Sequence, residues 1–218
     1  MTAPQTETVG RTGQAEKARR RICKAVIACL DRFGYNETSL GRVQNEAGIS
    51  RGALTHHFPT KEDMMVATLR QILEPVRLSG ARTGRAAPVS RPMSVHVELV
   101  RLWTETVDTV EGRALFEILV AARTDSELES RIKPSLVEYN DELGVGVLAI
   151  YRSRGRNDDD DVRTLWTICR VFLRGLHVQE RFGGDRQTIG LLMERFADLI
   201  SGEMVPRERN GNAQSVRE

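Results

Sequence analysis

Apolar residues recur at steps of three and four along most of this sequence, and this spacing constrains the fold more than any other feature. Between residues 15 and 33 the steps place one apolar face on a single helix: Ile22, Ala25, Val26, Cys29, Leu30 and Phe33. Gly34 is expected to end that helix. Similar spacing predicts five longer helices, near 93–110, 112–123, 126–152, 158–182 and 186–202. No alternating apolar and polar run is long enough to predict a sheet, so the sequence indicates an all-α fold.

The composition is that of a folded intracellular protein. The chain has 218 residues, of which 40% are hydrophobic, which is enough to bury an ordinary core. Its three cysteines form no C-x-x-C pair, cannot all be bridged and each lie in a helical apolar pattern, so we expect them to be small core residues in a reducing compartment. The sequence offers neither a signal peptide nor the roughly 18 uninterrupted apolar residues of a membrane span. We therefore expect a soluble, cytoplasmic protein that does not bind membranes.

The net charge of +2 hides an uneven distribution along the chain. Residues 1–61 hold ten Lys or Arg against five Asp or Glu, a balance of +5. The remaining residues hold 22 against 25, a balance of −3. The amino-terminal part is therefore the basic end of the chain.

Polarity and turn-forming residues divide the chain into segments. Residues 1–14 and 205–218 are polar, lack periodicity and are expected to be a disordered arm and a disordered tail. Residues 79–92 contain Gly, Ser, Arg and Pro and predict a loop. Between these segments we expect a small helical domain at 15–60, a connecting helix at 61–78 and a larger helical domain at 79–204.

Residues 38–58 predict two short helices joined by a tight turn. Thr38 or Ser39 is placed to cap the first helix. Gly48 ends it, because glycine adopts the positive φ that lets the chain reverse. Ser50 is a suitable N-cap for the second helix, which has the sequence RGALTHHF.

A third helix should follow directly. Thr60 and Asp63 are three residues apart and form a capping signal at its start. Apolar residues continue at helical spacing until Pro75, which is expected to kink or end the helix.

Two short helices joined by a glycine turn, with a basic helix in front, are the parts of a helix-turn-helix unit. In such a unit the second helix lies in the major groove of DNA, where base edges display a readable pattern of donors and acceptors. Leu54 and Phe58, four residues apart, supply the one apolar side with which this helix packs on the protein. The residues left to face outward or along the groove are Arg51, Ala53, Thr55, His56 and His57.

The adjacent histidines His56 and His57 have other possible roles. Neighbours on a helix point about 100° apart and cannot both face one metal ion, and the chain has no H-x-x-x-H or H-E-x-x-H motif. We therefore predict no metal site. A structural or capping role stays open beside contact with DNA.

A longer pattern runs through the same region: Thr38-Ser39, Val43-Gln44, Ala47-Gly48-Ile49-Ser50, Gly52, His57-Phe58 and Lys61-Glu62. On this pattern, residues 15–70 resemble the TetR/AcrR family of transcriptional regulators. The chain departs from the family at Gln44, where a small residue usually packs between the two helices, and at Thr55, where tyrosine is usual.

The resemblance implies that the matching residues bind double-stranded DNA. Arg51 and Ala53 would approach base edges, and Arg51 is able to clamp a guanine. Thr38 and Ser39 would offer backbone amides to phosphates at a helix start. The complete set of implied DNA-binding residues is Thr38, Ser39, Arg51, Gly52, Ala53, Thr55, His56, His57 and Lys61. The basic residues that would steer the duplex are Lys17, Arg19, Arg20 and Arg21.

The resemblance also implies that the larger domain binds an effector and forms a homodimer. Family members usually pair their last two helices with a second copy, and two recognition helices then read a palindromic operator. A pocket for a small organic effector is mostly apolar with a few polar anchors. The candidate lining residues are Trp103, Phe116, Tyr139, Trp166 and His177, for each of which plain core packing stays open. The acidic run Asp158–Asp161 indicates a stabilised helix start rather than a cation site.

These features favour a ligand-responsive, sequence-specific regulator, a repressor that a small molecule releases from its operator. An all-α enzyme is disfavoured because the chain shows no nucleophile and base at recognisable spacing, no glycine-rich phosphate loop and no metal cluster. We expect no cofactor. A third possibility, suggested by Gln44 and Thr55, is an interaction protein that kept the fold and lost operator binding.

Overall fold

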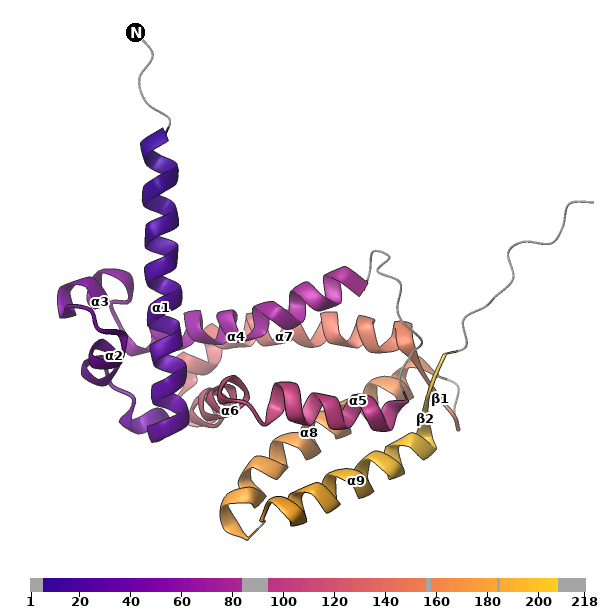
Figure 1. Cartoon of the computed structure of the whole chain (residues 1–218). Coiled ribbons are helices and arrows are strands. Elements are labelled where there is room, and N and C mark those ends of the chain that lie inside the picture. The colour runs from indigo at the N-terminus through magenta and orange to yellow at the C-terminus, as the bar shows by residue number, and fades with distance from the viewer. Residues whose placement is uncertain (1–5, 84–93, 156–157, 184, 208–218) are drawn as a thin grey trace, which may run out of the picture. The chain divides into compact units, whose positions relative to one another are not determined.

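A computed structural model describes residues 6–83, 94–155, 158–183 and 185–207, and nearly all of them are helical (Figure 1). The predicted all-α class is confirmed. The chain forms two compact units, each made of segments that are far apart in the sequence. Unit 1 contains the described residues of Met1–Ser79 and Glu105–Asn140, and unit 2 contains those of Gly80–Thr104 and Asp141–Glu218.

Unit 1 is a helical bundle around the first helix. Its helices are α1 (Thr6–Glu37), α2 (Leu40–Ala47), α3 (Arg51–His57), most of α4 (Lys61–Thr83), α6 (Val110–Ala122) and the first part of α7 (Ser126–Ile150). α1 packs against both α2 and α6. The core side chains with at most 1% of their surface exposed include Ile22, Leu30, Leu54, Met64 and Ile118. Because α6 shares this core, residues 105–140 group with the amino-terminal helices, and the expected single domain at 79–204 was wrong in that respect.

The first helix is longer than predicted. It begins at Thr6, whereas residues 1–14 were expected to be disordered. Extending an existing helix avoids the cost of starting one, so a polar segment without proline continues the helix of the residues that follow. Gly34 does interrupt the helical path, with φ 73° and ψ 176°, as its position predicted.

The helix after Thr60 is also longer than predicted. α4 runs through Pro75 to Thr83, so the expected end at Pro75 and the expected loop start at residue 79 were wrong. A proline removes one backbone donor but leaves the residues after it free to keep helical dihedral angles. The rest of the expected loop, residues 84–92, lies outside the described residues.

Unit 2 packs three helices and a small sheet. Its elements are the end of α4, α5 (Val95–Leu102), the start of the π-helix η1 (Trp103–Val107), the end of α7, β1 (Tyr151–Ser153), α8 (Asp159–Phe182), α9 (Arg186–Glu203) and β2 (Met204–Pro206). α9 packs against both α5 and α8. The expected helix at 93–110 is therefore α5 followed by η1. α6 begins separately at Val110 because Thr109 caps it, its hydroxyl accepting from the Gly112 amide at 3.0 Å.

The start of α8 confirms the structural interpretation of the acidic run. Asp158 is the N-cap, and its carboxylate accepts hydrogen bonds from the backbone amides of Asp160 and Asp161 at 2.6 and 3.3 Å. Asp159, Asp160 and Asp161 occupy the first turn, where negative charge stabilises the helix dipole.

A two-stranded antiparallel sheet was not predicted. β1 pairs with β2 in the register Tyr151 to Pro206 and Ser153 to Met204. Arg207 then clasps this end of unit 2, because its Nε donates to the carbonyls of Leu148 and Tyr151 at 2.7 and 2.9 Å. Its Nη2 reaches Asp159 at 2.6 Å. The expected disordered tail at 205–218 was therefore wrong for residues 205–207.

Replacing Arg207 with alanine should destabilise unit 2. The change removes charge-assisted hydrogen bonds to two carbonyl oxygens, worth about 1.5–3 kcal/mol in similar cases. Asp159→Asn is the matched control, because it weakens only the ion pair with Arg207, whose side chain is 41% exposed, and exposed pairs contribute about 0–1 kcal/mol. Urea unfolding followed by circular dichroism measures both changes. Equal losses in the two variants would contradict the assigned role of the carbonyl contacts.

Candidate nucleic-acid interface

The turn between α2 and α3 is fixed by local hydrogen bonds. Gly48 is left-handed, with φ 60° and ψ 44°, and its amide donates to the Asn45 carbonyl at 3.2 Å. Ser50 then caps α3, its hydroxyl accepting from the Ala53 amide at 3.2 Å. At the other end of α2, Ser39 is the N-cap and accepts from the Arg42 amide at 3.3 Å. The predicted caps and the predicted glycine turn are confirmed.

α3 buries one side and exposes the other. Leu54 and Phe58 are 0% and 1% exposed, as expected for the side that packs on the protein. Arg51, Gly52, Ala53 and His56 are exposed, and Thr55 and His57 are half-buried. The residues predicted to face outward are therefore exposed or half-buried. Together with the exposed Gly52 they make up what we call the α3 face: Arg51, Gly52, Ala53, Thr55, His56 and His57.

Three side chains of this region make contacts within the protein. The Thr55 hydroxyl donates to the carbonyls of Arg51 and Gly52 in its own helix, at 3.0 and 3.3 Å. The rings of His56 and His57 meet edge to face, with centroids 5.6 Å apart. The carbonyl of His57 accepts from Arg19 of α1 at 3.0 Å, so the end of α3 is tied to the first helix.

Arg19 has a different role from the electrostatic steering that the sequence suggested. Its guanidinium lies 4.4 Å from the centre of the Phe58 ring, in addition to its hydrogen bond to His57. It thereby covers the apolar side of α3 and binds the end of that helix. Arg19 precedes His57 by 38 residues, so no local pattern in the sequence predicts this contact.

Thr38 does not belong to the exposed surface. Its side chain is fully buried, its hydroxyl donates to the Gly34 carbonyl at 2.7 Å, and its amide donates to the Tyr35 carbonyl at 3.2 Å. Both donors are used inside the protein, so its predicted contact with DNA was wrong. Of the Thr38-Ser39 pair, Ser39 is the exposed member.

Lys61 is held by the protein as well. Its ammonium donates to the Tyr35 carbonyl at 2.6 Å and lies 4.1 Å from the centre of the Tyr35 ring. Burial lowers the pKa of Lys61, although the charges of Glu62 and Glu37 oppose this effect. Burial raises the pKa of Tyr35 to about 12, with smaller contributions from Asp125 and Glu62. In this structure Lys61 therefore stabilises the start of α4 against α1.

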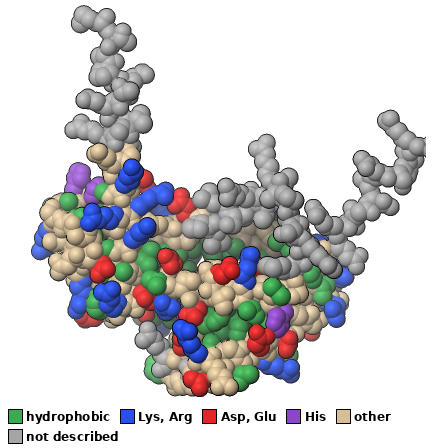
Figure 2. All heavy atoms as spheres, in the orientation of Figure 1, with side chains coloured by type: hydrophobic (Ala, Val, Ile, Leu, Met, Phe, Trp, Pro, Cys, Tyr) green, Lys and Arg blue, Asp and Glu red, His purple; other side chains and the backbone are tan. Residues whose placement is uncertain are grey.

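A basic strip on α1 accompanies the α3 face. Lys17, Arg21 and Lys24 follow one another at helical spacing, are exposed, and have no ion-pair partner among the described residues. Arg21 lies near the α2–α3 turn, since a side chain added at Gly48 would meet its Nη2 at 3.1 Å. Arg20 is instead paired with Glu16 and Glu74. Figure 2 shows histidine, Lys and Arg side chains gathered on the end of unit 1 that carries α3.

The start of α4 confirms the predicted capping signal. The Thr60 amide donates to Asp63 at 3.0 Å, and the Asp63 amide donates to the Thr60 hydroxyl at 3.1 Å. Asp63 also pairs with Arg131 of α7, and this hydrogen bond is the main reason that the pKa of Asp63 lies below its usual value. The element that follows the α3 face is thus fixed to α7 within unit 1.

The five predicted effector residues are distributed between the two units. Trp103, Trp166 and His177 belong to unit 2 and are 7%, 9% and 7% exposed. The rings of Trp103 and His177 lie close, with centroids 5.5 Å apart. Phe116 and Tyr139 belong to unit 1 and are half-buried.

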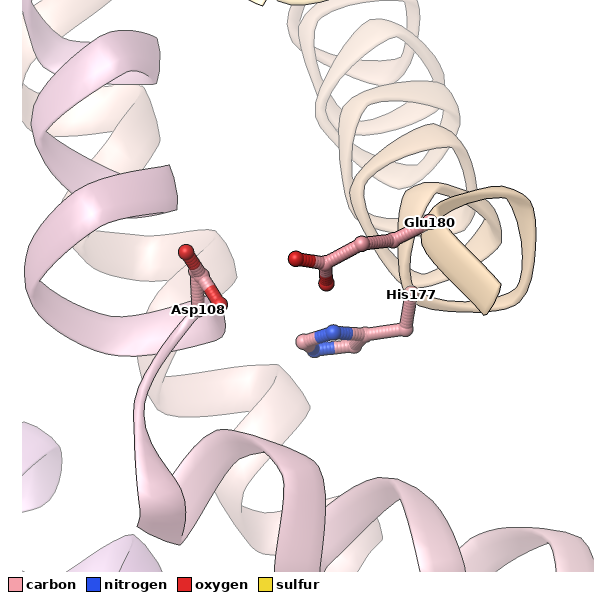
Figure 3. A group of neighbouring side chains, drawn as sticks. All are labelled: Asp108, His177 and Glu180. Carbon is pink, nitrogen blue, oxygen red and sulfur yellow. The ribbon is translucent and has the colours of Figure 1, made fainter. Parts of the chain in front are cut away.

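Glu180 of α8 lies close to His177, with a carboxylate oxygen within 4.8 Å of a ring nitrogen. His177 and Glu180 leave α8 one turn apart on the same side of the helix (Figure 3). Asp108, also drawn there, belongs to unit 1, where Arg113 binds it at 3.0 Å.

α8 and α9 expose apolar side chains on the sides that do not form the core of unit 2. The exposed apolar residues of α8 are Ile168, Val171, Val178 and Phe182, and those of α9 are Leu191, Leu192 and Leu199. On α8 they recur at helical spacing together with Gly175, where an added side chain would meet nothing within 4 Å. We call this surface the α8–α9 face.

Comparison with known proteins identifies the family. Residues 22–68, which include α2 and α3, match the bacterial regulatory proteins of the tetR family. Over 203 residues the chain is 30% identical to the HTH-type transcriptional regulator CymR of Pseudomonas putida, and the match covers 86% of this chain and 96% of CymR. The chain belongs to the TetR family. It is a helix-turn-helix transcriptional regulator, and the resemblance seen in its sequence is confirmed.

Solved structures extend the likeness of this TetR-family regulator over both units. The multidrug binding protein EbrR complexed with ethidium is 26% identical, with a TM-score of 0.52, and the match covers 82% of this chain and 98% of EbrR. A transcriptional regulator from Saccharomonospora viridis in complex with choline has a TM-score of 0.63 over 88% of this chain and 100% of that one. At 18% identity the second likeness shows the fold alone. No helix within the described ranges has the length and apolarity to cross a membrane.

Proposed function

We propose that this TetR-family regulator binds a specific operator by placing the α3 face in the major groove of DNA. The one-sided burial of α3 carries this proposal, because Leu54 and Phe58 hold the helix while its other side stays accessible. A major groove is about 12 Å wide and admits one helix. The exposed basic strip Lys17, Arg21 and Lys24 supplies charge for phosphates beside it.

Within the α3 face we assign different roles to the residues. Arg51 reads a base edge, because an exposed guanidinium at the start of the helix is able to donate two hydrogen bonds to guanine. Gly52 and Ala53 keep the helix narrow where it approaches the duplex. Thr55, His56 and His57 lie farther along the helix and contact phosphates or bases. Ser39 adds the amide end of α2 as a phosphate contact.

We further propose that the regulator is a homodimer that reads a palindrome. One seven-residue helix contacts too few base pairs to select a site, and two helices held about one DNA turn apart double the readout. The α8–α9 face is the surface we assign to the second copy, because it is apolar, exposed and contains Gly175, which permits close approach of another helix.

The last part of the proposal concerns regulation. A small organic effector binds in unit 2 beside Trp103, Trp166 and His177 and releases the regulator from its operator, so that the regulator acts as a repressor. The buried aromatic rings and the contact between Trp103 and His177 support this location. EbrR, a 26% identical multidrug binding protein solved in complex with ethidium, supports an organic molecule as the class of effector. Only an effector that binds one conformation more tightly than the other shifts the equilibrium.

Replacing Arg51 with alanine should weaken operator binding by a factor on the order of 5 to 150, the value of one bidentate base contact. The operator is sought in the DNA upstream of the regulator's own gene, and affinity is measured by fluorescence anisotropy. Arg154→Ala is the matched control, because Arg154 is an exposed arginine of unit 2 and loses the same charge. Equal affinity of wild type and Arg51→Ala would remove α3 as the reading element. A wild type that binds no duplex would favour the interaction-protein alternative.

The α8–α9 face predicts the oligomeric state. Val171→Glu places a charge on an exposed apolar position of α8, and burying it unpaired at an interface is unfavourable. We expect wild type to elute at twice the 24.5 kDa chain mass and the variant at the chain mass, measured by size-exclusion chromatography with light scattering. Val97→Glu is the control, since Val97 is 48% exposed on α5 of the same unit and should leave the dimer intact. If Val171→Glu and Val97→Glu both elute at the mass of the wild-type dimer, the interface lies elsewhere.

Effector binding should change tryptophan fluorescence. The chain has two tryptophans, Trp103 and Trp166, and both are buried in unit 2, where Trp103 contacts His177 at the proposed site. We expect compounds that release the regulator from its operator to shift or quench this emission, and Trp103→Phe to weaken their binding. N-acetyltryptophanamide with the same compounds corrects for absorption by the compounds. Operator release without any change in emission would exclude this location for the effector.

A further inference from the structure

The corner between α1 and α2 is held by side chains from two other helices. Gly34, with φ 73° and ψ 176°, breaks the helical path, and the Thr38 hydroxyl binds its carbonyl at 2.7 Å. Beyond the break, the Tyr35 amide donates to Oε2 of Glu117 on α6 at 3.0 Å. The Tyr35 carbonyl accepts from Lys61 on α4 at 2.6 Å. The peptide groups on both sides of Tyr35 are therefore fixed from outside the corner.

The Tyr35 amide depends on Glu117 for a reason that lies in the backbone. At a ψ of 176° the peptide group after Gly34 is turned away from the orientation in which its N–H meets a carbonyl one turn earlier. A donor turned away from the helix needs another acceptor, because leaving it unsatisfied in a partly buried place is unfavourable. Glu117 reaches across from α6, 82 residues later in the chain, and supplies that acceptor.

The contact between Glu117 and the corner is close. A side-chain carbon added at Gly34 would lie 3.1 Å from Oε2 of Glu117, so the carboxylate rests against the glycine backbone. Glycine suits this position for two reasons: it adopts the positive φ, and it has no side chain that would approach the carboxylate. The pattern described from Thr38 to Glu62 includes neither Gly34 nor Glu117.

α6 is itself fixed to α1 at a second place. Arg113, one turn before Glu117, pairs with Asp31 of α1 and with Asp108, the latter at 3.0 Å. The ion pair between Arg113 and Asp31 and the hydrogen bond between Tyr35 and Glu117 hold α6 beside the last turns of α1. The position of the Glu117 carboxylate is thus determined by α6 as a rigid element.

We infer that Glu117 is a positioning residue for DNA recognition, because it fixes the corner from which α2 starts. Ser39, the N-cap of α2, follows Tyr35 by four residues, and α2 leads through the Gly48 turn into α3. A displaced corner moves the start of α2 and with it the α3 face. The inference rests on the proposed function of that face. The acceptor oxygen, rather than the negative charge, is what Glu117 contributes.

Three variants at position 117 show whether the acceptor oxygen or the negative charge of Glu117 matters. Glu117→Ala removes the acceptor. Glu117→Asp keeps the charge on a shorter side chain that no longer reaches the Tyr35 amide. Glu117→Gln keeps an oxygen at the same distance without the charge. Glu111→Ala is the matched control, because Glu111 is an exposed glutamate in the first turn of the same helix.

Two measurements are made on the full chain. Hydrogen–deuterium exchange of peptides spanning residues 34–39 reports the corner directly and needs no DNA. Affinity for the operator and for a scrambled duplex reports positioning, because a displaced α3 loses base contacts while phosphate attraction remains. We expect Glu117→Ala and Glu117→Asp to exchange faster in this segment and to lose about tenfold in the ratio of operator to scrambled affinity. We expect Glu117→Gln and Glu111→Ala to match wild type.

Other outcomes overturn the inference. If Glu117→Asp matches wild type and Glu117→Gln does not, charge is what matters and the acceptor role is wrong. Unchanged exchange at residues 34–39 in both Glu117→Asp and Glu117→Ala overturns it even when no operator is known. Should Glu117→Ala fail to fold, the comparison of the Asp and Gln variants still decides. A wild type that binds no DNA contradicts the proposed function alone, since the exchange measurement stands apart from it.

Discussion

A helix of seven residues is not stable by itself in water, and this constraint governs the amino-terminal part of the regulator. Isolated helices shorter than about 12–15 residues are marginal, so α3 depends on its surroundings. Leu54 and Phe58 anchor it in the core of unit 1, Ser50 caps its first turn, and Arg19 binds its last carbonyl. The tertiary contacts that stabilise α3 therefore lie on one side or at the ends, and the rest of the helix is left for the DNA contact that we propose.

The same logic extends outward from α3 to the helices that support it. α1 carries Arg19 and packs on both α2 and α6, so it links α3 to the part of unit 1 that comes later in the chain. Asp63 and Arg131 join α4 to α7, and Glu117 joins α6 to the α1–α2 corner. These contacts give residues 105–140 a structural connection to the α3 face, although they are distant in the sequence.

Local signals in the sequence predicted local structure well. Ser39, Ser50 and the pair Thr60 and Asp63 cap helices as expected, because each partner lies within three residues. Thr38 was misjudged because its partner, the Gly34 carbonyl, depends on how α1 meets α2. The contact between Lys61 and the Tyr35 carbonyl was not predicted, because it depends on how α1 meets α4. A motif records which residue types recur, and it does not record whether a polar group faces the solvent or a carbonyl inside the protein.

The β1–β2 pair and Glu117 show a second limit. Strands of three residues are too short for alternation to be recognised, and their partners are about fifty residues apart. A single glutamate in an amphipathic helix gives no sign that it reaches a backbone amide 82 residues earlier. Contacts of this kind follow from the packed fold and become visible only when the helices are placed.

The division of α3 into a buried and an open side has a consequence for how such regulators diverge. Positions 51, 52, 53 and 56 contribute little to the core, whereas Leu54 and Phe58 contribute much. Exchanges at the open positions can thus alter which genes a descendant controls while its scaffold is inherited intact. A single short helix thus carries residues that maintain the fold on one side and residues that are free to change on the other.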